Sequence, residues 1–291
     1  MIFIKNFHIY LRTNGTAKST IENYVRDSKS FLSFSETPKD VFSITPTHIR
    51  TYLIYLEDIG RKKGTIGRVV CSLRSFFAYL VQEKIISENP AKSVAIPKKD
   101  KNLPKYISEA EVRAIIDAAT QTSLKNRLLV ELLYGSGGRV SEITSLKIDG
   151  IDFDSSFLDL FGKGSKERSN PIHEQCIVLI KQYMDAYGIK SGYLFPHATD
   201  PNRHMTRENV LKTVKKMAKK AGIDPSKVSP HVLRHSFATH LLDNGADMAY
   251  VQELLGHEDI ATTKIYAKIT KTNKKNSYAK FHPLASQSNA V

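Results

Sequence analysis

A proline- and lysine-rich run near residue 100 limits what this chain can fold into, because it separates two segments that must each bury their own core. The run Pro97-Lys-Lys-Asp-Lys-Asn-Leu-Pro104-Lys holds two prolines and four lysines and shows no apolar periodicity. This composition predicts a linker, although a long surface loop inside one domain would look the same. Ser108 and Glu111 fit a capping box that starts a new helix, which favours a real boundary. We therefore expect a first domain at residues 1–97, a linker at 98–106, a second domain at 107–270 and a tail at 271–291.

The first segment is predicted to be a compact helical bundle. Apolar residues recur with the 3.6-residue period of a helix in four stretches, and strand signals are almost absent. Thr45 and Pro46 mark the start of one helix, and Ser19 or Thr20 is expected to cap another. The expected helices are residues 2–12, 19–35, 46–60 and 63–83.

The charge balance points to a polyanionic partner. The chain has 43 Lys and Arg residues against 29 Asp and Glu residues, a net charge of +14. An excess of this size is typical of proteins that bind nucleic acid through counterion release, with a merely cationic protein as the alternative.

The longest apolar runs are too short to span a bilayer, so a membrane partner is not expected. Cys71 and Cys176 lie far apart and lack metal-ligand spacing, which favours a reducing cytoplasm.

Two basic residues in the second segment stand where a phosphate could bind. Arg139 follows the glycine-rich turn 135–138 at a helix start, where backbone amides and the helix dipole favour an anion. The turn lacks the Lys-Ser/Thr ending of a P-loop, and an ion pair with Glu142 would explain Arg139 equally well. Lys163 is expected in the turn of a β-hairpin over residues 157–172, where lysines are usually just solvated. From there to residue 220 the sequence predicts mostly helix.

The stretch from Ser229 to Tyr266 holds the densest set of functional side chains. Ser229 followed by proline predicts a helix start, which places His231 and Arg234 on one face at the positive helix end. The set comprises His231, Arg234, His235, His240, His257 and Tyr266. Imidazoles, a guanidinium and a phenol at these spacings suit a phosphate. A zinc site made of three of the histidines is the alternative, but HExxH and cysteine clusters are absent and a helix start suits an anion better.

Together these features resemble the tyrosine recombinase (phage integrase) family, and the close match is to its Xer-type site-specific recombinases. The motifs are YGSGGRVSE with Arg139, GKGSKER with Lys163, HVLRHSFATHLL with His231 and Arg234, LLGHEDIATT with His257, and KIYAKI with Tyr266. All six active-site positions are filled in order. Gly138 departs from the pattern, since a bulky apolar residue is commoner there, and this could loosen the placement of Arg139. The resemblance implies a mainly α fold with a small antiparallel β-sheet: a helical N-terminal bundle that clamps DNA, and an α+β catalytic domain.

The resemblance also implies the chemistry. Tyr266 would attack a DNA phosphodiester, leaving a 3′-phosphotyrosyl bond and a free 5′-hydroxyl; a phenol, with an ordinary pKa of about 10, needs activation to do so. The other roles would be nonbridging-oxygen binding by Arg139 and Arg234, proton exchange with the phenol by His231, hydrogen bonding to the phosphate by His257, and protonation of the leaving oxygen by Lys163. Arginines supply the positive charge and one phosphoester replaces another, so neither a metal nor ATP is expected as a cofactor.

The implied partners are double-stranded DNA with a specific recombination site and further recombinase subunits. A tetramer on two DNA sites would be a homo-oligomer or would include a related recombinase, with a DNA translocase as a possible activator. Residues from Asn276 onward resemble the helix that docks onto the neighbouring subunit, and a basic disordered tail is the alternative. Xer-type resolution of chromosome or plasmid dimers is expected. A mobile-element integrase, a type IB topoisomerase-like enzyme and a catalytically silent DNA-binding protein are the alternatives.

Overall fold

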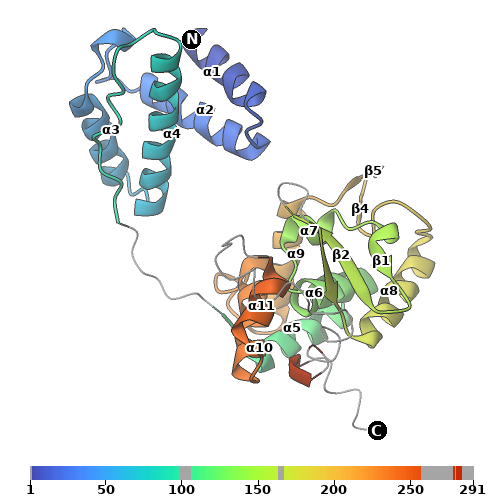
Figure 1. Cartoon of the computed structure of the whole chain (residues 1–291). Helices are drawn as coiled ribbons and strands as arrows, with labels where there is room; N and C mark the ends of the chain where they lie inside the picture. Colours follow the sequence, from blue (N-terminus) through green and yellow to red (C-terminus); the bar gives the residue numbers. More distant parts are fainter. Residues whose placement is uncertain (1, 99–105, 163–166, 257–277, 279, 284–291) are drawn as a thin grey trace. The chain divides into compact units, whose positions relative to one another are not determined.

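The computed structural model describes residues 2–98, 106–162, 167–256, 278 and 280–283 (Figure 1). The chain divides into two compact units, Met1–Asn102 and Leu103–Val291, each with its own apolar core. Among the described residues, no helix combines the length and the apolar character that crossing a membrane requires. Most of the expected linker lies outside the described residues.

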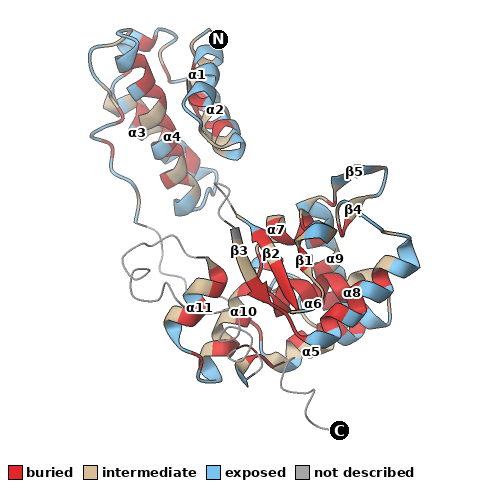
Figure 2. Cartoon of the chain, turned by 45° about the vertical axis from the view of Figure 1, so that its right-hand side comes forward, coloured by how far each residue is buried: buried red, intermediate tan, exposed pale blue. Residues whose placement is uncertain are grey.

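The first unit is the helical bundle that the apolar periodicity predicted. Its helix α4 carries many buried side chains, among them Leu73, Phe76 and Phe77, and Figure 2 shows buried positions along much of its length. Asp27, a buried carboxylate on α2, accepts hydrogen bonds from Arg68 and from Ser72 Oγ (2.8 Å) and so ties α2 to α4. The helices are α1 (Ile2–Thr13), α2 (Lys18–Leu32), α3 (Pro46–Asp58) and α4 (Lys63–Gln82), with a 3-10 turn η1 (Val41–Ser43).

The start of α2 differs from the prediction. Ala17 is the N-cap residue, and no side chain caps the helix. Its carbonyl accepts hydrogen bonds from the backbone N–H groups of Thr20 (2.8 Å) and Ile21 (3.0 Å). Ser19 and Thr20 therefore lie inside the first turn, where their hydroxyls are past the capping position, and the prediction that one of them caps α2 is wrong.

The second unit is built around α6 (Leu124–Gly135), whose residues from Leu128 to the helix end are all buried. A helix that is buried on all sides must lie inside its unit, and α5, α8 and α10 pack against it. The predicted capping box of Ser108 and Glu111 starts α5. The other helices are α5 (Glu109–Thr120), α7 (Val140–Thr144), α8 (Glu174–Tyr187), α9 (Arg207–Lys220), α10 (Pro230–Asp243) and α11 (Met248–Leu255), with a 3-10 turn η2 (Ile148–Gly150).

Two small antiparallel sheets complete this unit and confirm the mainly helical fold class. The first has the order β1-β2-β3, with strands β1 (Ile151–Asp152), β2 (Phe157–Phe161) and β3 (Glu167–Pro171). Leu158 of β2 pairs with Asn170 of β3, which confirms the predicted hairpin. The second sheet, β4 (Pro196–His197) with β5 (Asp200–His204), lies where we expected mostly helix. Its strands are short and lack the alternating apolar residues that would reveal a strand in the sequence.

The described part of the tail packs into the core of its own second unit. Tyr278 is 2% exposed and His282 is 0% exposed. Their rings stack with centroids 4.6 Å apart, and the His282 ring also contacts Tyr134 and Phe237. Docking of the tail onto a neighbouring subunit stays a prediction.

Candidate functional site

The glycine-rich turn after α6 is held between two apolar side chains. Gly137 has φ +61°, and a Cβ atom there would lie 2.5 Å from the Phe237 ring of α10. A Cβ atom on Gly138 would lie 2.7 Å from Ile143 Cδ1 of α7. Ile143 thus fills the space that a larger side chain at position 138 would need. The turn therefore has little conformational freedom, and it fixes the backbone of Arg139 at the start of α7.

Arg139 is the N-cap residue of α7 and is bound to Glu142. Its backbone N–H donates to Glu142 Oε2 (2.6 Å), and its Nη1 donates to Oε1 (2.9 Å). Nη2 donates to the carbonyl of Gly256 (3.2 Å), the C-cap residue of α11. The structure thus contains the ion pair that the sequence offered as an alternative explanation of Arg139. The Arg139 side chain is still 40% exposed, so it can also reach an external anion.

Arg234 reaches the same turn from α10. Its side chain is only 10% exposed, and its Nη1 donates to the carbonyl of Gly137 (2.7 Å). Nη2 donates to the carbonyl of Leu255 at the end of α11. Two guanidiniums that are 95 positions apart in the sequence (139 and 234) therefore meet at one turn and at the end of one helix.

Arg168 is a site residue that the sequence did not reveal, and it is a second partner of Glu142 beside Arg139. The Glu142 side chain is 1% exposed and is bound by Arg168 through two hydrogen bonds, Nη1 to Oε1 (2.7 Å) and Nη2 to Oε2 (2.6 Å). Nε of Arg168 donates to the carbonyl of Leu254 (2.9 Å), which Asn170 also contacts. An acid three positions after Arg139 was visible in the sequence, but nothing local marked Arg168 as its partner.

The charges around Glu142 do not cancel. Burial by itself would raise the pKa of Glu142, but hydrogen bonds from Arg168 and Arg139 outweigh it and hold the pKa below its ordinary value. Burial, aided by the charges of Arg139 and Arg168, lowers the pKa of Arg234 to about 10, so its guanidinium is still charged at neutral pH. One carboxylate among three guanidiniums leaves an excess of positive charge. This arrangement can bind a phosphodiester and stabilise further negative charge on it.

The histidines of α10 differ in burial: His231 is exposed, His235 is half-buried and His240 is buried. His231 is exposed, and its Nε2 lies 3.1 Å from Nε2 of His235. His240 is buried, and its Nδ1 lies 2.9 Å from the Tyr134 hydroxyl. Within the described ranges, the three do not form a group of possible metal ligands. His231 is thus the histidine of this helix that stays accessible next to Arg234.

Three of the predicted site residues, Lys163, His257 and Tyr266, lie outside the described residues. Lys163 falls in the connection between β2 and β3. His257 directly follows Gly256, whose backbone has φ 60° and whose carbonyl is bound by Arg139. The described site therefore contains Arg139, His231 and Arg234 of the predicted set.

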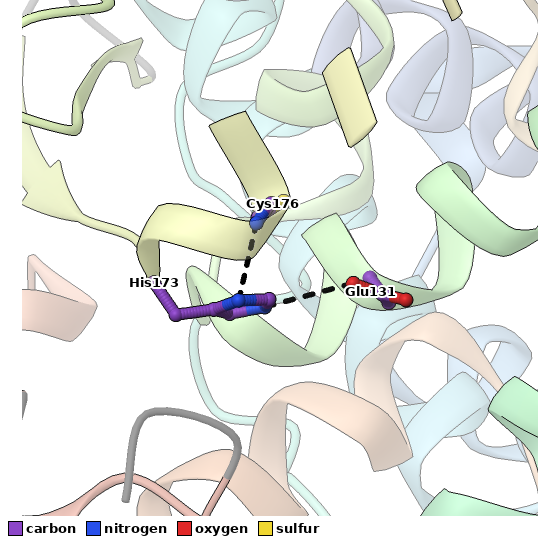
Figure 3. Close-up of side chains that lie close together, drawn as sticks. All are labelled: Glu131, His173 and Cys176. Atoms are coloured by element: carbon purple, nitrogen blue, oxygen red, sulfur yellow. Dashed lines mark hydrogen bonds and ion pairs between the residues drawn. The ribbon is translucent and has the colours of Figure 1, made fainter. Parts of the chain in front are cut away.

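Glu131, His173 and Cys176 form the group of possible metal ligands found in the described part of the chain, with ligand atoms within 4.8 Å of one another (Figure 3). His173 Nδ1 accepts a hydrogen bond from the backbone N–H of Cys176 (3.1 Å) and so caps α8. A neutral imidazole that accepts at Nδ1 carries its proton on Nε2, so neither ring nitrogen keeps a lone pair for a metal. That Nε2 lies 3.6 Å from Glu131, which pairs with Arg127 at 2.7 Å. We interpret this cluster as a structural helix cap.

Sequence comparisons cover both units. The profile of the phage integrase family matches residues 105–273, and that of the phage integrase N-terminal SAM-like domain matches residues 4–84. Tyrosine recombinase XerD of Halalkalibacterium halodurans is 38% identical over 289 residues, which is 96% of either chain. Tyrosine recombinase XerD of Haemophilus ducreyi is 37% identical over 275 residues, 91% of this chain and 92% of the other.

Solved structures agree with these matches. The crystal structure of XerA recombinase is 28% identical, with a TM-score of 0.50 over 99% of this chain and 98% of the other. A lambda integrase dimer bound to a COC′ core site is 19% identical, with a TM-score of 0.72 over 91% of this chain and 76% of the other. At that identity the second likeness shows a shared fold.

Proposed function

Since the chain belongs to the phage integrase family of tyrosine recombinases, which catalyse DNA strand exchange, we propose that Tyr266 is its nucleophile and that Arg139 and Arg234 bind the phosphodiester under attack. The observation that carries this proposal is the convergence of the two guanidiniums. Both contact the end of α11, at Gly256 and Leu255, directly before His257 in the sequence. A phosphate between them would receive donors from both sides.

In the proposed reaction the phenolic oxygen of Tyr266 bonds to phosphorus as the bond from phosphorus to the 5′-oxygen breaks. The phenol proton passes to His231, which supports this role by being exposed beside Arg234. Lys163 gives a proton to the leaving 5′-oxygen, and His257 donates a hydrogen bond to the phosphate. Arg139 and Arg234 stabilise the charge that grows on the nonbridging oxygens. The 5′-hydroxyl of a partner strand then reverses these steps, so the number of phosphoester bonds is conserved and ATP is not needed.

The surface of α9 supports a DNA-binding role for the second unit. One side of the helix packs into the core through Val210, Val214 and Met217. The other side exposes five lysines, which are Lys212, Lys215, Lys216, Lys219 and Lys220. Exposed lysines on one helical face bind phosphates without regard to sequence, so this face would hold the duplex against the site.

The cellular role that we propose is Xer-type resolution of chromosome or plasmid dimers. Its support is the identity of 34–38% to proteins named XerD over nearly the whole chain. The assembly would contain two DNA sites and four recombinase subunits, either all copies of this chain or two copies with a related recombinase. A DNA translocase would be the activating partner of such a system.

Covalent capture of DNA tests the chemistry. The wild-type protein is incubated with sheared genomic DNA of its source, denatured, and assayed for protein-linked DNA 3′ ends. We expect the adduct with the wild-type protein and its loss in Tyr266→Phe, with duplex binding unchanged. Tyr187→Phe is a matched control, because it removes an exposed phenol on α8 and should leave the adduct intact.

Sequencing the captured DNA tests the role. A single chromosomal locus would support dimer resolution, and the ends of a mobile element would support an integrase instead. An adduct that persists in Tyr266→Phe would overturn the assignment of the nucleophile.

A further inference from the structure

Arg168 and Arg139 compete for one carboxylate, but they are held very differently. Oε1 of Glu142 accepts from both guanidiniums, and Oε2 accepts from Arg168 and from the Arg139 backbone N–H. The Arg168 side chain is 12% exposed, whereas that of Arg139 is 40% exposed. Each of the three guanidinium nitrogens of Arg168 donates within the protein, the third to Leu254. Arg168 is therefore fixed, and Arg139 is the partner of Glu142 that can turn toward a ligand.

A buried carboxylate needs a permanent counter-ion if Arg139 is to leave it. Breaking a buried ion pair by removing one partner is strongly unfavourable, because the remaining charge has lost its water. If Arg139 were the sole partner of Glu142, its move onto a phosphate would carry that cost in every catalytic cycle. With Arg168 in place, Glu142 keeps two side-chain hydrogen bonds and the backbone N–H of Arg139.

We propose that Arg168 is a positioning residue that neutralises Glu142 so that the Arg139 guanidinium can transfer from Glu142 to the scissile phosphate. The inference rests on the proposed role of Arg139 as a phosphate ligand. Arg168 does not touch the phosphate in this scheme. It also joins β3 to α7 and to the end of α11, so the strand that follows Lys163 is tied to the helix that precedes His257.

The charge balance gives the expected effect of losing Arg168. Three guanidiniums and one carboxylate carry two net positive charges. Without Arg168 the cluster carries one net positive charge. Glu142 then binds Arg139 more strongly, because it has lost its other hydrogen-bonded guanidinium. Removing a single preorganised donor from an oxyanion site commonly lowers the rate by about 10²–10³-fold. We expect Arg168→Met to slow adduct formation at saturating DNA by about 100-fold, while the Kd for duplex DNA changes less than threefold.

A second substitution distinguishes this electrostatic role from a purely structural one, in which Arg168 only holds β3, α7 and α11 together. Glu142→Gln placed in the Arg168→Met chain removes the charge that captures Arg139, so adduct formation should recover at least tenfold relative to Arg168→Met. If Arg168 only held the elements together, the double variant would lose another contact and would be slower than Arg168→Met. That result would overturn the proposal, as would a wild-type rate in Arg168→Met. Arg168→Lys, which keeps the charge, should fall between wild type and Arg168→Met and covers the case in which Arg168→Met does not fold.

Sulfate provides a test that needs no DNA cleavage. Sulfate that binds Arg139 and Arg234 should raise the Tm above that in sodium chloride of equal ionic strength, because it binds the folded state. The specific part of this rise is the part lost in Arg139→Met. We expect it to vanish in Arg168→Met and to return in Arg168→Met/Glu142→Gln; unchanged sulfate stabilisation in Arg168→Met would refute the role of Arg168. A chain that binds sulfate as expected but never forms an adduct would contradict the proposed function and not this inference.

Discussion

The hydroxyl of Tyr278 donates a 2.6 Å hydrogen bond to the carbonyl of Gly135, the last residue of α6. Burial raises the pKa of Tyr278 well above its ordinary value, so the hydroxyl keeps its proton and stays a donor. Gly135 immediately precedes the turn that carries Arg139. The tail is thereby connected, through one buried contact, to the part of the site that we propose binds the phosphate.

Tyr278→Phe should destabilise the second unit without removing the ring that packs against His282. The substitution leaves the Gly135 carbonyl buried without its side-chain donor, which costs about 1–3 kcal/mol. Tyr278→Ala should cost about 3–5 kcal/mol, because it also leaves a cavity. Urea denaturation of both variants measures the two losses.

The same variants show whether the contact is made within one chain. For a contact within the chain, the loss of stability should be independent of protein concentration. A loss that grows as the protein is concentrated would mean that the tail instead occupies another copy in solution.

Gly137→Ala should inactivate the site, because the backbone conformation of residue 137 favours glycine and the Phe237 ring leaves no room for a Cβ atom. The left-handed conformation costs an alanine about 1–2 kcal/mol, and its Cβ would lie 2.5 Å from the buried Phe237 ring. We expect a total loss of stability of about 3 kcal/mol or more and loss of adduct formation, since the Gly137 carbonyl also positions Arg234.

Gly188→Ala is the matched control for this substitution. Gly188 has φ +65°, but nothing lies within 4 Å of a Cβ atom there. Gly188→Ala should therefore show the backbone cost alone and keep full activity. Equal losses in the two variants would mean that contact with Phe237 contributes nothing.

The sequence predicted those parts of the fold that depend on near neighbours. The start of α5 at the Ser108–Glu111 capping box and the start of α10 at Ser229-Pro230 follow from capping chemistry within a few residues. The Arg139–Glu142 pair is three positions apart and was open to the same local reasoning. These features are confirmed because the interactions that produce them are local.

Contacts between distant segments could not be predicted in this way. Arg168 binds Glu142 across 26 positions, and Arg234 binds the Gly137 carbonyl across 97. Every residue has a backbone carbonyl, so the sequence does not indicate which carbonyl an arginine will bind. The hairpin β4–β5 could not be predicted either, because its strands lack the alternation of apolar and polar residues that marks a strand in the sequence.

Stability should fall as the pH is lowered below neutral, with His173 as one cause. Burial and the charge of Arg127 lower the pKa of His173 to about 4, against about 6.5 in an unfolded chain. Between these values the unfolded chain binds a proton that the folded chain rejects, so acid favours unfolding; above pH 6.5 the residue contributes no pH dependence. The loss at pH 4 amounts to roughly 3 kcal/mol. At pH 5 the loss is already roughly 2 kcal/mol, and urea denaturation at pH 7.5 and at pH 5 measures it.

His173→Asn isolates this contribution. Asparagine is a good N-cap residue and can accept the Cys176 N–H, but it does not titrate. The variant should lose less stability than the wild type between pH 7.5 and 5. Some dependence should remain, since burial also lowers the pKa values of His240 and His282. Identical pH dependences in the two proteins would exclude His173 as a cause.

The lysines of α9 should contribute to the salt dependence of DNA binding. Lys215 and Lys219 lie one turn apart on the exposed side of the helix, so Lys215→Gln/Lys219→Gln would remove up to two phosphate contacts. Each lost contact lowers the slope of log K against log salt by about 0.9, so the slope should fall by up to about 1.8.

Lys181→Gln/Lys190→Gln removes the same charge from exposed positions on and after α8 and serves as the control. Fluorescence anisotropy with a duplex at several salt concentrations gives both slopes. Equal slopes in the two double variants would show that net charge, and not the α9 face, determines the affinity.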